Sequence, residues 1–189
     1  MRIKIGTDST ADIPREVRER LDINVLPLSV VHEGREYVEN VDITPEEFYV
    51  TLENCEKIPT SSQVTTQAYV DFYEKTFAAG YTDLIQISLN AKGSGTFQSG
   101  VVAKDLFFEA HPEAAGKFAI HNVDSETYSM LYGHAVIKAA EMARNGASVE
   151  EIIAKVERMV KSVRGVFVPL TLRFVKKSGR VSAAAAFLG

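Results

Sequence analysis

The stretch DLIQISLNAKGSGTFQS, residues 83–99, contains the pattern that decides the fold class. Its first seven residues are mostly apolar and predict a buried strand, and a glycine–serine–glycine loop follows at 93–95. Helical spacing then continues to about Ala110. A loop of this kind between a strand and the amino end of a helix is suited to binding an anion. The sequence therefore predicts an oxyanion site at Ser94 and Gly95.

The rest of the chain repeats this alternation of strands and helices. Further strands are expected at 3–7, 24–31, 117–123 and 165–170, with a short returning strand after the turn at 33–34. Further helices are expected after Asp12 as cap with Pro14 in the first turn, from a capping box at Thr44 to about Cys55, and over 67–79. A long helix is expected after Asp124-Ser125, ending near Gly146, and another from a capping box at Ser148. The segment 57–65 is expected to be a loop.

This order of elements favours an α/β fold, a parallel sheet with right-handed crossovers and helices on both faces. We expect an N-terminal α/β domain at 1–164, which carries the candidate loops, and the start of a second α/β domain at 165–189. The last residues, LRFVKKSGRVSAAAAFLG, end in an alanine-rich apolar stretch that barely allows two helical turns. The second domain is therefore expected to be truncated.

Composition excludes several classes of protein. The formal net charge of −4 and the pI of about 5.6 argue against a nucleic-acid binder or a general binder of anionic membranes. The first ten residues are too short and too charged for a secretory signal, and no apolar run reaches the ~20 residues that span a bilayer. The single cysteine, Cys55, has no disulfide partner within the chain, and no Cys/His cluster suggests a metal. A cytoplasmic protein without a metal or cofactor is expected.

Ligands of parallel sheets bind outside the carboxyl ends of the strands. Three loops are expected there, and they contain Ser9, Ser94 and Ser125; the segment PTSSQ at 59–63 adds further hydroxyl groups. Hydroxyl groups beside a helix amino end suit an oxyanion better than a metal. The same residue types are also the usual helix caps, so for any one loop a capping role is about as probable.

Standard catalytic motifs are not matched. Gln98 stands where a dinucleotide fingerprint needs glycine, and valines 101–102 stand where a Walker A motif needs Lys and Ser/Thr. Ser94 lacks the flanking glycines of a nucleophile elbow, and no histidine pairs with it at the level of sequence. Asp8, Asp12 and Asp124 either form a carboxylate cluster or cap the surface ends of elements. The basic group at 173–180 is either a solvated face or a positive patch beside the pocket.

Five motifs in order resemble those of the DegV family of bacterial fatty-acid-binding proteins. They are DSTADIP (8–14), PTSSQ (59–63), SLNAKGSGTFQS (88–99), VDSETYSM (123–130) and LRFVKKSGR (172–180). The resemblance covers the whole chain, and five ordered motifs are more specific than a single glycine loop. It implies a two-domain α/β protein that buries an acyl chain between its domains and holds the carboxylate in a hydroxyl-lined site.

The resemblance also implies a partner and a set of residues. A separate ATP-dependent fatty acid kinase would phosphorylate the bound carboxylate, so the protein itself would not be an enzyme, and peripheral membrane contact would allow lipid exchange. The family's carboxylate-binding hydroxyls align with Ser61, which Thr60 can assist, and with Ser94. An arginine of the family's GGR motif aligns with Arg180, although Ser178 replaces its first glycine. Gly93 stands where the family usually has an apolar residue.

Two other hypotheses compete with the lipid carrier. One is an enzyme, a phosphotransferase or hydrolase, that acts on a small anionic substrate at the same loops. The other is a fragment that keeps the fold of the first domain without its ligand function. The absence of standard catalytic motifs from the sequence favours the carrier.

Overall fold

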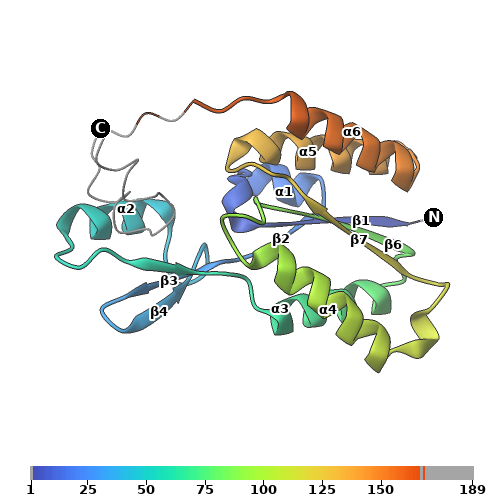
Figure 1. Ribbon diagram of the computed structural model, residues 1–189, viewed down its shortest axis with the longest axis horizontal. Helices are drawn as coiled ribbons and strands as arrows, with labels where there is room; N and C mark the ends of the chain where they lie inside the picture. The colour runs from blue at the N-terminus through green and yellow to red at the C-terminus, as the bar shows by residue number, and fades with distance from the viewer. Residues whose placement is uncertain (1, 167, 169–189) are drawn as a thin grey trace. The chain divides into compact units, whose positions relative to one another are not determined.

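The computed structural model describes residues 2–166 and 168 of the chain (Figure 1). These residues divide into two compact units. The first consists of Met1–Pro27 and Gln63–Val163, and the second contains Leu28–Ser62 with the few described residues after Val163. The range expected for the first domain, 1–164, is thus interrupted by Leu28–Ser62. The strand expected at 165–170 and the basic group at 173–180 lie largely or wholly outside the described residues.

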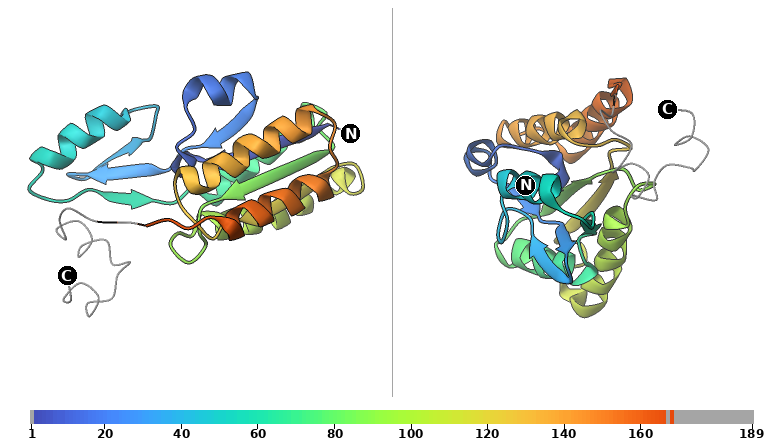
Figure 2. Two further views of the ribbon diagram at one scale, coloured as in Figure 1. Left: turned by 90° about the horizontal axis from the view of Figure 1, so that it is seen from above. Right: turned by 90° about the vertical axis from the view of Figure 1, so that its left-hand side faces the viewer.

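The first unit is built on a four-stranded parallel sheet in the order β2-β1-β6-β7. Helices α1, α5 and α6 cover one face, and α3 and α4 cover the other (Figures 1 and 2). This arrangement confirms the predicted α/β fold with helices on both faces. The strands are β1 (Ile3–Asp8), β2 (Ile23–Leu26), β6 (Asp83–Ser88) and β7 (Ala119–Asp124). The helices are α1 (Arg15–Arg20), α3 (Thr66–Ala78), α4 (Thr96–Ala110), α5 (Met130–Arg144) and α6 (Val149–Ser162), with short 3-10 turns η1 (Ser9–Ala11) and η2 (Pro112–Ala114).

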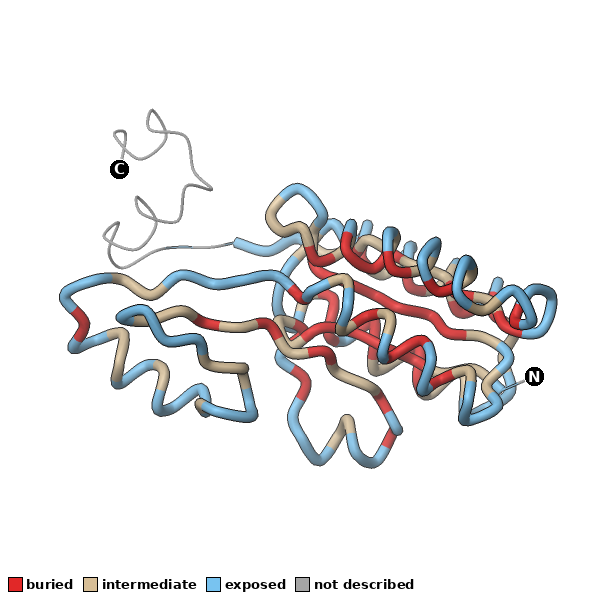
Figure 3. The backbone as a smooth tube through the Cα atoms, turned by 90° about the horizontal axis from the view of Figure 1, so that it is seen from below, coloured by how far each residue is buried: buried red, intermediate tan, exposed pale blue. Residues whose placement is uncertain are grey.

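Burial of both sheet faces explains why these segments form strands. Five of the six β6 residues are buried, as expected of an inner strand in a parallel sheet (Figure 3). On one face, apolar side chains of α5 and α6 such as Val136 and Ile152 pack against Ile85 and Ile87. On the other face, Phe107 of α4 packs edge-on against Tyr73 of α3. The core of this unit therefore lies in two layers, one on each side of the sheet.

The second unit contains a three-stranded antiparallel sheet in the order β4-β3-β5. Its strands are β3 (Ser29–His32), β4 (Arg35–Val38) and β5 (Thr60–Ser62), and its helix is α2 (Pro45–Asn54). Glu33 and Gly34 form the turn between β3 and β4, both with positive φ, as tight hairpin turns require. Thr44 and Glu47 form the predicted capping box at the start of α2.

Three local predictions were wrong. The strand expected at 24–31 is two strands in two sheets, because Pro27 lacks the N–H that would continue the parallel pairing of β2. The loop expected at 57–65 contains β5, which pairs with β3. Asp12 does not cap α1. It ends η1 in the left-handed conformation, and Pro14 is the N-cap without a side-chain bond.

Close contact between α5 and η1 gives a testable prediction. A Cβ at Gly133 would overlap the carbonyl oxygen of Ala11, so we expect Gly133→Ala to destabilise the protein. Helix propensity alone would stabilise it by about 1 kcal/mol, whereas overpacking typically costs about 1–3 kcal/mol. Urea unfolding should show a net loss, and the exposed neighbour variant His134→Ala should stay within about 0.5 kcal/mol of wild type. A more stable Gly133→Ala protein would contradict the contact.

Candidate functional site

Three loops leave the carboxyl ends of neighbouring strands in the first unit. The segment 9–12 follows β1, 89–95 follows β6, and 125–129 follows β7. Because β1, β6 and β7 are adjacent and parallel, these loops lie at one edge of the sheet. This is the edge at which parallel α/β proteins bind ligands.

Hydrogen bonds join the second and third of these loops. The Asn90 N–H donates to the Thr127 carbonyl oxygen over 3.0 Å, and the Ala91 N–H donates to Asp124 Oδ1 over 3.1 Å. The Ser129 hydroxyl donates to the Asp12 carboxylate and so links the third loop to the first. The loops therefore form one connected surface around the amino end of α4.

Asp8 lies beneath this surface and is fully buried. Its Oδ2 accepts a hydrogen bond from the Leu89 N–H over 2.9 Å, at the point where β6 passes into its loop. Its Oδ1 accepts bonds from the Thr10 hydroxyl over 2.6 Å and from the Tyr132 hydroxyl over 2.7 Å. Asp8 thus connects the end of β1, the end of β6 and the first turn of α5.

Burial raises the pKa of the Asp8 carboxyl group above its ordinary value of 3.8, despite the hydrogen bonds that it accepts. The geometry agrees with this direction. The Thr10 and Tyr132 hydroxyl oxygens are also only 2.8 Å apart, so three oxygens form a triangle with two hydroxyl protons between them. If Asp8 carries a proton and donates it to one of the two hydroxyl groups, that hydroxyl can donate to the other, and all three sides then hold a hydrogen bond.

Ser94 occupies the predicted position before α4. Its Oγ accepts a hydrogen bond from the Thr96 N–H over 3.2 Å and lies 3.0 Å from Thr96 Oγ1. Thr96 is fully buried, and its Oγ1 also accepts a bond from the Val64 N–H over 3.3 Å. A buried hydroxyl proton without an acceptor is costly, so the Thr96 proton is best placed on Ser94 Oγ.

With Thr96 as its donor, Ser94 keeps its own hydroxyl proton for another acceptor. The side chain is half-buried, and the first intrahelical bond of α4 runs from the Ser99 N–H to the Gly95 carbonyl oxygen. The N–H groups of Phe97 and Gln98 precede that ladder and point out of the helix end. Together with the helix dipole, these donors favour a bound oxyanion.

Gly95 lets a second segment approach the loop. A Cβ at Gly95 would overlap Oε1 of Gln63, and Gln63 Nε2 donates to the Ser99 hydroxyl over 2.8 Å. The side chain of Gln63, which precedes α3, therefore lies directly against the backbone of the candidate loop. The sequence alone predicts Gly95 only as part of an anion-binding loop and does not predict its close contact with Gln63.

The other predicted site residues fall in different places. Ser9 is half-buried at the start of η1, at the same sheet edge. Ser125 is fully buried, and its hydroxyl donates to the Thr127 carbonyl oxygen, so it has a structural role in its turn. Thr60 and Ser61 are exposed on β5 of the second unit, and Arg180 lies outside the described residues.

The carboxylates predicted as a possible cluster each bind backbone or hydroxyl donors instead. Asp124 Oδ1 accepts bonds from the N–H groups of Ala91 and Glu126, and Asp12 accepts one from Ser129. Within residues 2–166 and 168, no group of three His, Cys, Asp or Glu side chains could hold a metal ion. In the same residues, no helix combines the length and apolar character needed to cross a bilayer.

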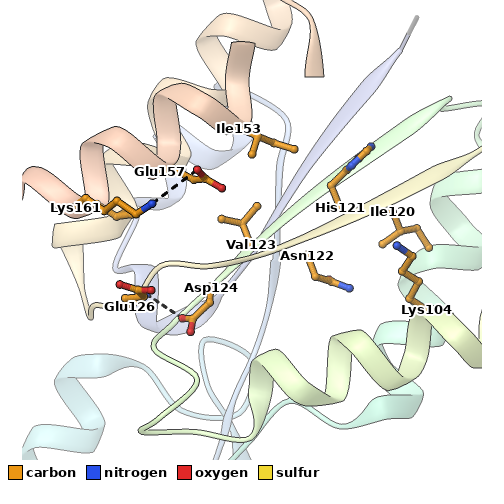
Figure 4. Close-up of a pocket in the computed structure, with 11 residues that line it drawn as sticks. Lys104, Ile120, His121, Asn122, Val123, Asp124, Glu126, Ile153, Glu157 and Lys161 are labelled. Carbon is orange, nitrogen blue, oxygen red and sulfur yellow. Dashed lines mark hydrogen bonds and ion pairs between the residues drawn. The ribbon is translucent and has the colours of Figure 1, made fainter. Parts of the chain in front are cut away.

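A pocket of about 380 Å³ lies along β7, the outer strand of the parallel sheet (Figure 4). His121 and Val123 line it on the side of α6, and Asn122 lines it on the side of α4. Glu157 and Lys161 form an ion pair of 3.9 Å on its wall. Its lining mixes charges of both signs and does not include Ser94, so the pocket is separate from the predicted oxyanion site.

The chain matches the family model of DegV proteins over residues 2–189. It belongs to the DegV family. A DegV domain-containing protein of Clostridium perfringens is 35% identical over 189 residues, which are 100% of this chain and 65% of that protein. Protein DegV of Bacillus subtilis is 35% identical over 190 residues, 100% of this chain and 64% of that protein. The chain thus spans just under two thirds of the length of these relatives.

Solved structures of family members have the same fold. Bacillus subtilis DegV, described as a fatty acid binding protein, has a TM-score of 0.87 at 35% identity. A DegV family protein of Thermus thermophilus, described by its fatty acid binding, has a TM-score of 0.82 at 32% identity. Each comparison covers 100% of this chain and 64% of the other chain. The resemblance inferred from the five motifs is therefore confirmed at the level of family and fold.

Sequence reasoning missed three side chains that shape this edge of the sheet. Asp8 is interpreted from the sequence either as part of a carboxylate cluster or as a surface cap, Gln63 only as part of a hydroxyl-rich loop, and Tyr132 is not singled out. In the sequence, Asp8 directly follows an apolar strand, and this position is compatible with a buried residue at the end of that strand. No local pattern indicates that Tyr132 reaches Asp8 from a distance of 124 residues in sequence.

The buried Asp8 carboxyl group predicts a pH dependence of stability. Because its pKa is raised on folding, the native state holds this proton more tightly than the unfolded state does. Its contribution to the free energy of unfolding is therefore fully present below pH 3.8 and is lost as the pH rises to the folded-state pKa. Asp8→Asn has no such proton to lose.

We expect the difference in unfolding free energy, wild type minus Asp8→Asn, to decrease as the pH rises from about 4 to about 8. Urea unfolding of both proteins at several pH values measures this difference. A difference that is constant or grows with pH would show that the pKa of Asp8 is not raised.

Proposed function

We propose that this protein binds a long-chain fatty acid and holds its carboxylate at the amino end of α4. Ser94 and Gly95 supply the central donors, with Ser9 at the same sheet edge. Thr60 and Ser61 of the second unit, and Arg180, complete the headgroup site in the ligand-bound protein. The observation that carries the proposal is the position of the Ser94 hydroxyl at the amino end of α4, where it accepts from the Thr96 N–H and lies 3.0 Å from the buried Thr96 Oγ1.

Ser61 is close in sequence to a residue that contacts the loop of Ser94. The chain passes from the second unit to the first between Ser62 and Gln63. Gln63 lies against Gly95 of the candidate loop, and Ser61 is only two residues before it. Family members described as fatty-acid-binding proteins, at 32% and 35% identity, support a fatty acid as the class of ligand.

The acyl chain supplies most of the binding free energy in this proposal. Burying about 14 methylene groups contributes on the order of 11 kcal/mol, before the costs of association and of ordering the chain. A carboxylate at a helix amino end gains about 0.3–2 kcal/mol. The tail therefore determines how tightly the lipid is held, whereas the headgroup loop determines how the carboxylate is presented.

We further propose that the protein performs no chemistry itself. A separate ATP-dependent kinase phosphorylates the presented carboxylate to an acyl phosphate, and peripheral contact with a membrane loads and unloads the lipid. The protein needs no cofactor for this role, and a cytoplasmic location would give it access to ATP-dependent partners. A hydroxyl group that donates to a carboxylate oxygen orients the carboxylate, and each oxygen keeps a second lone-pair site that is accessible for the phosphoryl transfer.

Mass spectrometry tests the ligand directly. The purified protein, native and then after organic extraction, should yield one long-chain fatty acid per chain, and the extract identifies the acyl length. Protein that has been delipidated and incubated with palmitate should regain one molecule. A spectrum that shows no lipid after this incubation would contradict the proposed function.

The acyl chain is proposed to determine affinity and the headgroup loop to determine presentation of the carboxylate, and this division gives a second test. We expect Ser94→Ala to weaken fatty-acid binding by less than about tenfold, because the tail dominates, and to reduce kinase-dependent acyl-phosphate formation more strongly. Ser61→Ala should act in the same direction. Ser162→Ala, at the end of α6, is the matched control and should change neither quantity. A loss of affinity of about a hundredfold from Ser94→Ala with the fold intact, about 2.7 kcal/mol, would contradict this division.

A further inference from the structure

The phenol ring of Tyr128 lies against the backbone of Gly93, next to Ser94. A Cβ at Gly93 would overlap the Tyr128 hydroxyl oxygen and would come within 3.0 Å of its Cζ. Any side chain at position 93 would therefore displace the phenol. Glycine at this position therefore makes room for a hydroxyl group from another loop.

The backbone around Tyr128 is firmly held. Asn90 donates to the Thr127 carbonyl oxygen over 3.0 Å and, through Nδ2, to the Glu126 carbonyl oxygen over 3.1 Å. Glu126 and Ser129, close to Tyr128 on either side, have φ values of 55° and 56°, which L-residues rarely adopt. Such conformations persist where surrounding contacts enforce them.

The side chain of Tyr128 is nevertheless accessible. It is 46% exposed, although its ring edge touches the loop. Consecutive Cα atoms are about 3.8 Å apart, so a group that covers Gly93 is close to the donors of Ser94. A phenol hydroxyl group can donate a hydrogen bond to an acceptor beside it.

We propose that Tyr128 is a selectivity residue whose hydroxyl donates to the ligand's carboxylate beside Ser94. This inference rests on the proposed function and gives a role in its headgroup site to Tyr128, a residue of the motif at 123–130 to which the resemblance assigns no role. A carboxylate only accepts hydrogen bonds, and two hydroxyl donors can each serve one of its oxygens. The pair therefore favours a free fatty acid over the corresponding alcohol or ester, whose headgroup is uncharged.

The test compares palmitate with hexadecanol, which has the same tail length but no charge. Isothermal or fluorescence titration should show that Tyr128→Phe weakens palmitate binding about fivefold and changes hexadecanol binding less than twofold. Tyr81→Phe removes a phenol hydroxyl at the opposite end of β6, where it donates to Asp22. This control should bind both ligands as wild type does.

Gly93→Ala provides a second, independent variant. It should displace the phenol and weaken palmitate binding to a similar degree. In a double-mutant cycle, Gly93→Ala combined with Tyr128→Phe should be no weaker than either single variant, because both remove the same hydrogen bond. Thermal unfolding of each variant checks that the fold is intact.

Several results would overturn the inference. Wild-type affinity of Tyr128→Phe for palmitate would show that the hydroxyl does not contact the carboxylate. Equal losses for palmitate and hexadecanol would show that the ring acts only by packing. If wild type itself bound neither ligand, the proposed function would fail, and the role of Tyr128 would fail with it. Binding of palmitate by wild type separates the first two results from the third.

Discussion

The buried carboxyl group of Asp8 connects the elements on which the candidate site depends. It accepts hydrogen bonds from the end of β6 at Leu89, from η1 at Thr10 and from α5 at Tyr132. Without these bonds, three segments would meet at the sheet edge with unpaired polar groups. Burial raises the pKa of the Asp8 carboxyl group, and the hydrogen bonds that this group accepts offset part of the cost of burial and hold the loops above it.

Glycines determine how closely those loops approach one another. Gly133 brings α5 against η1, Gly95 admits the side chain of Gln63, and Gly93 admits that of Tyr128. Each contact places a polar group beside a backbone that a larger residue would cover. The glycine–serine–glycine sequence therefore serves two purposes, since it allows an anion to approach and also lets neighbouring segments complete the wall of the site.

Local patterns predicted most of the fold. The capping boxes at Thr44 and Ser148 and the apolar strand at β6 depend on neighbouring residues, and all three were confirmed. The break at Pro27 was missed because apolar residues continue on both sides of it, although the strands join different sheets. The Asp8–Tyr132 and Gly93–Tyr128 contacts join residues far apart in sequence, and pair contacts of this kind leave no local pattern. The position of Ser94 before α4 was predictable, whereas the direction of its hydroxyl proton depends on the buried Thr96.

The central claim, that the amino end of α4 binds a fatty-acid carboxylate, is tested most directly by a crystal structure of the protein with palmitate. The account predicts a carboxylate oxygen within hydrogen-bond distance of Ser94 Oγ, about 2.5–3.0 Å, and the other oxygen near the Tyr128 hydroxyl. The acyl chain should then lead away from the edge formed by β1, β6 and β7. A carboxylate bound elsewhere, or an acyl chain whose methyl end lies at Ser94, would contradict the account.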